Sequence, residues 1–363
     1  MRADNLFFFT ENNVAILSAG GFVIGFIFGA IVIATNFCTM GAIADIVTRG
    51  DYRRFRSWVL AAAVALIGAQ ALAAAGFLQL DQSVYLRGGL HWFGSIAGGL
   101  IFGFGMVLAG GCPSRNIARA GAGDLRALTT LLVIALFAHM AMGGLLGPAR
   151  VLVDRYTVAS MPGGSPPSLA DFAAHLAGVD GAGALRLALA LTLASAALFY
   201  CFISRPFRSS PRHMLAGATI GGCAVAGWVI TTLAHDDFAV TPVAPTSLSF
   251  VRPVAESVDY VTRFTGMTAM DFGVALVMGA FAGAMAMALL TRRFRIVGFA
   301  DGADTSRNLA GAALMGVGGV LALGCSIGQG VAGVSTMAMD SFLAFAAIAA
   351  GAVMGIKSIE NRV

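Results

Sequence analysis

The stretch Gly98–Cys112, GGLIFGFGMVLAGGC, returns 213 residues later as Gly311–Cys325, GAALMGVGGVLALGC. When each copy is started one residue earlier, nine of sixteen positions are identical. Both copies end in a cysteine, and a helix break is predicted directly after it. The repeat therefore places two thiols at equivalent points in two parts of the chain.

The composition around this repeat is that of an integral membrane protein. Apolar residues make up 58% of the 363 residues, charged residues make up 11%, and the mean hydropathy is +0.83. The apolar runs are long, continuous and rich in Gly and Ala, without the strict alternation of a lipid-facing strand. We therefore expect an all-α membrane protein rather than a barrel.

The apolar runs predict about nine transmembrane helices, together with short broken or re-entrant helices. We expect one transmembrane domain over 1–363, with a first half-repeat at 14–147, an external connection at 148–183 and a second half-repeat at 184–357. The nine predicted spans are 14–36, 57–78, 91–111, 126–147, 184–203, 213–233, 269–290, 309–324 and 339–357.

The basic residues indicate how these spans are oriented. If the N-terminus is outside and the C-terminus is cytoplasmic, sixteen of the 23 Lys and Arg residues lie inside, against six of the 18 Asp and Glu residues. Positive charge of this kind marks cytoplasmic segments. The net charge of +5 is thus a topology signal, and no basic stripe on a soluble domain indicates nucleic-acid binding.

In this orientation the two repeats run in opposite directions across the membrane. The helix before Cys112 runs inward and the helix before Cys325 runs outward, so the halves are predicted to be inverted and pseudo-symmetric. With an offset of 74, Cys38 matches Cys112. In inverted repeats, substrate sites lie near the membrane midplane, where discontinuous helices meet. The repeat therefore indicates a transporter.

The five cysteines fall into two groups. Cys38, Cys112 and Cys325 are followed at once by TMG, PSRN and SIGQG, where a helix is predicted to stop and restart. Cys201 and Cys223 lie within ordinary spans and are interpreted as small core residues. The chain has no CxxC pair or His cluster, so we expect no metal and no cofactor.

A restarted helix exposes free backbone amides that attract anions. Pro113 suits the first helical position, because its missing N–H costs nothing there. We expect three helix starts to converge on one small anion, and a thiol is a soft partner for a substrate that carries sulfur. The predicted path residues are Cys38, Thr39, Cys112, Ser114, Arg115, Asn116, Cys325, Ser326, Gly328 and Gln329.

Three motifs in this chain resemble those of the YeeE/YedE family of bacterial inner-membrane sulfur-compound transporters. They are NFCTMGAIAD, IFGFGMVLAGGC and GAALMGVGGVLALGCSIGQG. The resemblance covers nearly the whole chain. It implies a nine-span, hourglass-shaped protein in which Cys38, Cys112 and Cys325 relay thiosulfate inward. It also implies a cytosolic sulfur-carrier partner of the TusA type.

We therefore predict uptake of a small sulfur-containing anion, with thiosulfate as the expected substrate, through a multi-pass protein of the bacterial inner membrane. Arg115, Asn116 and Asn36 depart from the residues usual in the family, which leaves a related sulfur or selenium species as an alternative substrate. Arg115 is interpreted equally well as a charge that snorkels to the cytoplasmic surface.

The remaining features narrow the mechanism. Lys357 is the only lysine, so the chain has no GxxxxGK phosphate loop and is not expected to be an ATP-hydrolysing enzyme.

A membrane thiol-disulfide oxidoreductase, in which two of the three cysteines form a disulfide, is the alternative function from another class of protein. His139 lies within a span and is expected to be satisfied by a neighbouring backbone group.

Overall fold

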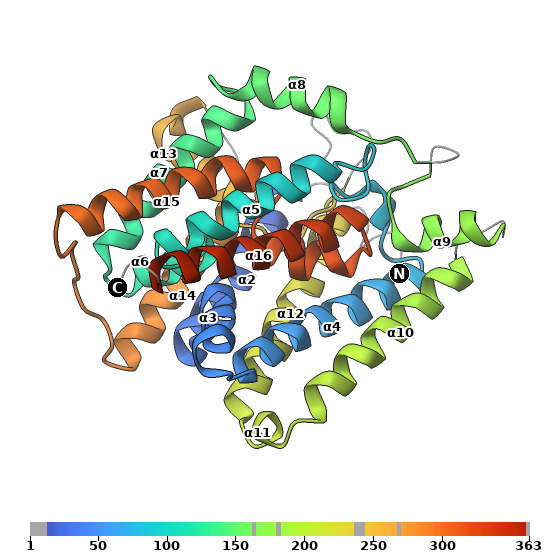
Figure 1. Ribbon diagram of the computed structural model, residues 1–363, viewed down its shortest axis with the longest axis horizontal. Coiled ribbons are helices and arrows are strands. Elements are labelled where there is room, and N and C mark those ends of the chain that lie inside the picture. The colour runs from blue at the N-terminus through green and yellow to red at the C-terminus, as the bar shows by residue number, and fades with distance from the viewer. Residues whose placement is uncertain (1–12, 162–164, 179–182, 236–243, 267–269, 361–363) are drawn as a thin grey trace.

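The computed structural model describes residues 13–161, 165–178, 183–235, 244–266 and 270–360, which form a bundle of helices (Figure 1). Its long helices are α2 (Asn13–Thr35), α4 (Arg53–Ala74), α5 (Trp92–Leu108), α7 (Leu125–Met142), α10 (Gly183–Phe202), α12 (Pro211–Leu233), α14 (Phe272–Leu290), α15 (Gly302–Leu321) and α16 (Met339–Glu360).

Shorter elements join or extend these helices. They are α3 (Thr39–Arg49), η1 (Leu80–Gln82), α6 (Pro113–Gly121), α8 (Gly147–Thr157), α9 (Leu169–Ala177), α11 (Arg205–Arg208), α13 (Val251–Thr262), η3 (Phe264–Gly266) and the π-helix η4 (Gly328–Gly333). Three isolated bridges are the only β pairing within the described residues, so the all-α class is confirmed. The predicted connection 148–183 contains α8 and α9 rather than loop alone.

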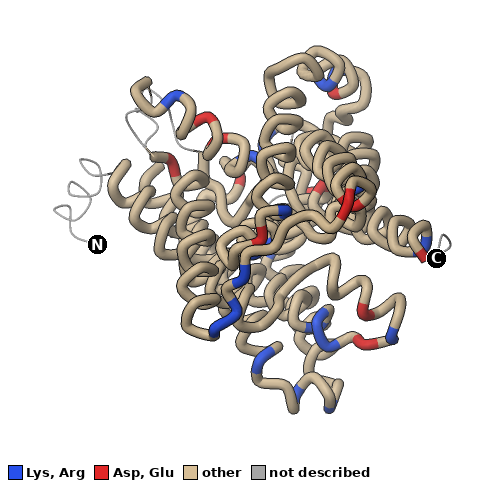
Figure 2. Tube along the Cα trace, turned by 90° about the vertical axis from the view of Figure 1, so that its left-hand side faces the viewer, with Lys and Arg blue, Asp and Glu red and all other residues tan. Residues whose placement is uncertain are grey.

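Eight helical segments of the described chain are long and apolar enough to cross a membrane, so the protein is a multi-pass membrane protein. Two of them, Val14–Arg49 and Trp92–Gly121, run through a helix break. The predicted span 309–324 corresponds to most of α15, which is not among the eight because its first turns are polar. Figure 2 shows charged residues mainly at helix ends and connections. The count of nine stays a prediction.

Glycines let α2 and α14 pack at backbone distance. A Cβ added to Gly25 would lie 2.2 Å from the carbonyl oxygen of Leu276, and one added to Gly29 would lie 1.9 Å from that of Ala280. In return, Gly283 of α14 faces the carbonyl of Phe26. No side chain larger than hydrogen fits at these contacts. Close approach through small residues is the usual means of helix association in membranes.

The repeated helices α5 and α15 pack against each other through equivalent residues. A Cβ on Gly98 would lie 2.7 Å from the carbonyl oxygen of Gly318, and a Cβ on Gly311 would lie 2.6 Å from that of Gly105. Gly311 and Gly318 are the repeat equivalents of Gly98 and Gly105. The contact of Gly98 with Gly318 is therefore the counterpart, in the other copy of the repeat, of the contact of Gly311 with Gly105. The pairing is antiparallel, as two inverted copies require. Inversion of the other helices stays a prediction.

A continuous apolar core fills the space between the packed helices. Its largest fully buried side chains include Phe28, Phe102, Met106 and Met315, contributed by α2, α5 and α15. Large apolar side chains on the outside of the bundle are exposed instead, as expected for a surface that contacts lipid. The core therefore lies around the points where α2, α5 and α15 end.

Candidate functional site

The three breaks share one backbone geometry. Two residues before each cysteine, the chain takes the left-handed conformation: φ is 61° at Asn36, 70° at Gly110 and 54° at Leu323. This conformation ends a helix and is adopted most easily by Gly and then by Asn. Asn36, which departs from the family pattern, therefore still suits its position. Leu323 adopts the same conformation against its intrinsic preference.

Each cysteine then begins the next helical segment. The amide of Gly41 donates to Sγ of Cys38 at 3.4 Å, and the amide of Gly328 donates to Sγ of Cys325 at 3.3 Å. Sγ of Cys112 lies 3.2 Å from Oγ of Ser114. The Cys38 and Cys325 thiols thus accept the cap hydrogen bond that a Ser or Asp oxygen usually accepts, whereas Cys112 is the N-cap residue of α6 without a side-chain cap bond. The predicted stop and restart is present at all three sites.

Some of the backbone amides at the helix starts already form hydrogen bonds within the helices. The amide of Asn116 donates to the carbonyl of Cys112 at 2.9 Å, and the amide of Gln329 donates to that of Cys325 at 2.8 Å. The sequence predicts free amides at the restarted helix, but the Asn116 amide is not free, because it makes the first hydrogen bond of α6. The amides of Ser114 and Arg115, which precede it in the first turn, form no backbone hydrogen bond among the described residues.

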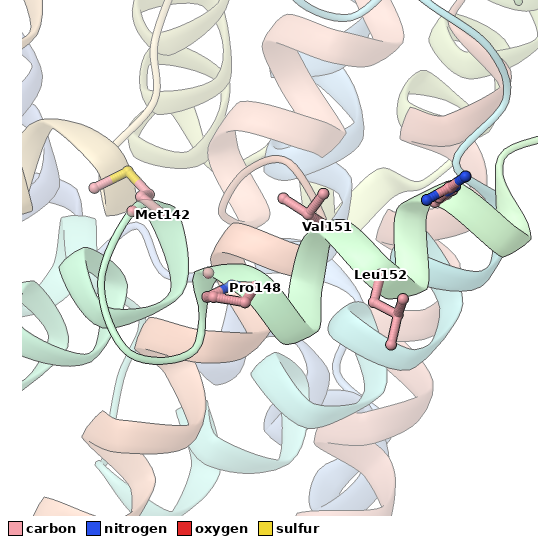
Figure 3. A pocket seen from close by; sticks show the side chains of 7 residues that line it. Met142, Pro148, Val151 and Leu152 are labelled. Carbon is pink, nitrogen blue, oxygen red and sulfur yellow. The ribbon is translucent and has the colours of Figure 1, made fainter.

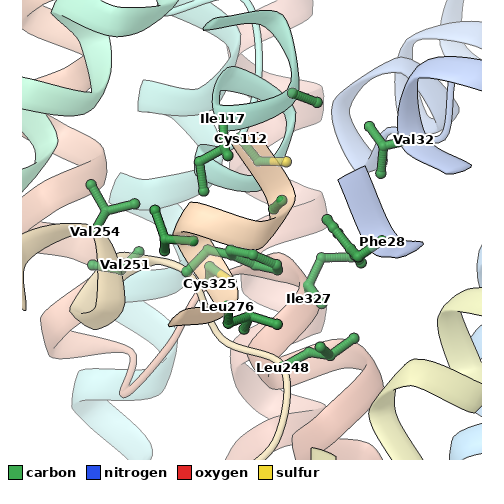
Figure 4. Close-up of a cluster of buried hydrophobic side chains, with 14 of the residues drawn as sticks. Phe28, Val32, Cys112, Ile117, Leu248, Val251, Val254, Leu276, Cys325 and Ile327 are labelled. Atoms are coloured by element: carbon green, nitrogen blue, oxygen red, sulfur yellow. The ribbon is translucent and has the colours of Figure 1, made fainter. Parts of the chain in front are cut away.

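The three thiols come together at the centre of the bundle. The Cys38 thiol neighbours that of Cys112, and Cys325 lies near Cys112. Their exposed fractions are 6%, 2% and 1%. Figure 4 shows Cys112 and Cys325 within one apolar cluster, with Phe28 and Ile327 beside them. All five cysteines are free thiols.

A chain of hydrogen bonds joins the first break to the third. The Trp58 indole donates to Oγ1 of Thr39 at 3.1 Å, and the Thr39 hydroxyl donates to Oγ of Ser326 at 3.1 Å. An indole N–H can only donate, so Thr39 is the acceptor in the first bond and keeps its own proton for Ser326. The Ser326 proton has no acceptor among the described residues. It is therefore available to an anion beside Cys325.

We expect Trp58→Phe to weaken anion binding without unfolding the protein. Phenylalanine keeps the stack on Phe345, whose ring centroid lies 4.1 Å away, but removes the N–H that fixes the Thr39 hydroxyl. One neutral hydrogen bond is worth about 1 kcal/mol, so KM for uptake should rise about fivefold. Thiosulfate uptake kinetics measure this effect.

Thr39→Val removes the next member of the same chain. The two substitutions combined should raise KM no more than either one alone, whereas additive effects would contradict a shared chain. Trp92→Phe is the control, because Trp92 is 43% exposed and lies away from the breaks. KM should stay at its wild-type value in that variant.

The residues that follow Cys112 have separate roles. The Arg115 guanidinium donates to Oδ1 of Asn36, and it also donates to the carbonyl of Val32 at 3.4 Å. Nδ2 of Asn116 donates to the carbonyl of Gly111 at 3.0 Å, while its buried Oδ1 has no partner among the described residues. Arg115 therefore bridges the first two breaks rather than only snorkelling to the surface.

A basic pocket of about 290 Å³ opens beside Arg115. Arg119, Arg293 and Arg295 contribute to its lining, with Asp124 as the acidic member. Arg119 is paired with Asp124 at 2.6 Å, whereas Arg293 and Arg295 form no ion pair within the described residues. The pocket adjoins the Cys112 break and carries excess positive charge.

Three residues interpreted from the sequence form hydrogen bonds within the helix bundle. Gln329 is buried. Its amide nitrogen donates to the carbonyl of Ala322 at the end of α15, and its amide oxygen accepts from the Ser341 hydroxyl. His139 bonds the carbonyl of Ala255 at 2.8 Å, which confirms its structural interpretation. Cys201 donates to the carbonyl of Arg56 at 3.3 Å, in a core cluster separate from that of Cys112 and Cys325.

A larger pocket lies away from the thiols. It has a volume of about 440 Å³ and lies where α7 meets α8, lined by Met142, Pro148, Val151 and Leu152 (Figure 3). Its apolar lining includes none of the predicted path residues. Among the described residues, no three His, Cys, Asp or Glu side chains gather to hold a metal ion.

A membrane-spanning bundle with discontinuous helices meeting at its buried centre defines the class of membrane transport proteins. The sequence profile of the family described as sulphur transport matches residues 34–354, so the chain belongs to that family. It is therefore a multi-pass transporter of sulfur compounds rather than an enzyme.

Two relatives are similar over most of their length. The thiosulfate transporter TsuA of Escherichia coli strain K12 is 28% identical over 336 residues, which cover 89% of each chain. The thiosulfate transporter TsuA of Spirochaeta thermophila is 24% identical over 334 residues, covering 89% of this chain and 93% of the relative.

Proposed function

We propose that this protein carries thiosulfate into the cell across the bacterial inner membrane, past Cys38, Cys112 and Cys325. The observation that carries the proposal is the meeting of three N-cap thiols at one buried point. Thiosulfate has a soft terminal sulfur and three sulfonate oxygens. Thiols suit the sulfur, while first-turn amides and the Ser326 hydroxyl suit the oxygens.

The thiols act as protonated partners in this proposal. A thiolate would repel a divalent anion that is already costly to desolvate. The S–H group is a weak donor, and its polarizable sulfur contacts the substrate without trapping it. The basic pocket beside Arg115 receives the anion as it leaves the thiols, because Arg293 and Arg295 have charge to offer there.

The direction of transport follows from the proposed orientation, with the N-terminus outside and the C-terminus cytoplasmic. The basic pocket then faces the cytosol. We propose that a TusA-type sulfur-carrier protein takes up the delivered sulfur, so that consumption of the product sustains inward movement. Vesicles that enclose this carrier should accumulate more labelled sulfur than vesicles without it.

Competition in proteoliposomes tests the substrate. Labelled thiosulfate should enter vesicles that contain the purified protein, and unlabelled thiosulfate should abolish the signal. Sulfate at a hundredfold excess should not, since it lacks a soft terminal sulfur. Equal competition by sulfate or selenite, or a failure of thiosulfate to enter at all, would overturn the proposal.

A further inference from the structure

Two hydroxyl groups meet beside the break at Cys325. Tyr85 lies between η1 and α5, with its ring packed edge-on against Trp228 at 6.1 Å between centroids, and Ser249 lies just before α13. A Cβ added to Gly328 would lie 3.2 Å from the Ser249 hydroxyl oxygen and 3.4 Å from that of Tyr85. Both oxygens therefore border the residue whose amide caps Cys325.

Neither hydroxyl has a hydrogen-bond partner among the residues that the structure describes. Tyr85 as a whole residue is only 5% exposed. The neighbouring Ser247 hydroxyl, by contrast, donates to the carbonyl of Ala224 at 2.6 Å. Ser249 is half-buried, so Tyr85 is the buried residue of the two. Polar groups of buried residues are normally paired, and an unpaired one calls for an explanation such as a ligand.

The chemistry at this point suits an oxyanion. Burial raises the pKa of Tyr85, so the phenol keeps its proton and can donate. Ser249 can donate as well. Glycine at position 328 leaves the space between the two hydroxyls free of a side chain.

We propose that Tyr85 and Ser249 form an outer binding site for the oxygens of the incoming anion, next to Cys325. The site rests on the proposed function and adds a step to it. Both residues lie on segments that the proposed topology places outside. The anion is held there by two hydroxyl donors before its terminal sulfur reaches the Cys325 thiol.

The test uses Tyr85→Phe, Ser249→Ala and the double variant in the full-length protein. Phenylalanine keeps the ring against Trp228 and removes only the donor. Each single variant should raise KM for thiosulfate about tenfold, and the rate at saturation should stay within about twofold. The thermal midpoint without thiosulfate should not fall, because neither hydroxyl bonds the protein.

Ser247→Ala is the matched control, since its hydroxyl is paired within the protein. It should lower the thermal midpoint and leave KM unchanged. Wild-type KM in all three test variants would overturn the outer site, and so would a fall in their thermal midpoint without a change in KM. If the wild-type protein fails to transport thiosulfate, the proposed function fails instead.

Discussion

Cys112→Ala and Cys325→Ala should each reduce thiosulfate uptake about 100-fold, the loss expected when a buried group that bonds a charged ligand is removed. Both thiols lie at helix starts in the core, and Cys112 also neighbours Cys38. Alanine leaves a gap at the narrowest part of the proposed path. Uptake of labelled thiosulfate, in cells that lack any other route for it, measures the effect.

Loss of the cap must be separated from loss of transport. Cys325→Ser keeps an N-cap acceptor for the Gly328 amide but removes the soft sulfur, so the protein should fold while uptake stays low. Cys223→Ala is the matched control, because Cys223 is also buried but lies inside α12. Wild-type uptake in both Cys112→Ala and Cys325→Ala would remove the thiols from the path.

The breaks could be predicted because their signal is local. A glycine-rich apolar run that ends in Gly-Cys or Phe-Cys, followed by Pro, Ser or Thr, specifies a helix end and a new start within a few residues. The left-handed conformation of Gly110 belongs to the same signal. That of Leu323 could not be predicted, because glycine is preferred in this conformation and Leu323 is a branched residue that is 40% exposed. Two backbone hydrogen bonds at the end of α15 hold the turn, from the amide of Leu323 to the carbonyl of Val320 and from that of Gly324 to the carbonyl of Gly319.

The contacts between the breaks could not be predicted in this way. The bond from Thr39 to Ser326 spans 287 residues, and Trp58 joins it from a third helix. Nothing in the sequence near Trp58 separates it from an ordinary core tryptophan. Gln329 shows the opposite case, because its position after Cys325 predicted a substrate donor. Its amide nitrogen instead donates to the carbonyl of Ala322 at the end of α15, and its amide oxygen accepts from the Ser341 hydroxyl of α16.

Gly29→Val should prevent α2 from packing on α14. A Cβ at position 29 would lie 1.9 Å from the carbonyl oxygen of Ala280 and 2.9 Å from its Cα. These are backbone atoms within a helix, so relief requires the two helices to separate. Overpacking of a close contact costs about 3 kcal/mol or more. The expected result is little or no folded protein, measured by size-exclusion chromatography of a fluorescent fusion in detergent.

Gly222→Val is the matched control, because a Cβ on Gly222 of α12 has no atom within 4 Å. The substitution is the same and both glycines lie within transmembrane helices, so intrinsic helix propensity contributes equally. Folded yield should stay near that of the wild type in this variant. Equal yields from Gly29→Val and Gly222→Val would contradict the close packing of α2 on α14. Because α2 leads directly into the Cys38 break, that outcome would also remove the support that holds the first thiol beside the second.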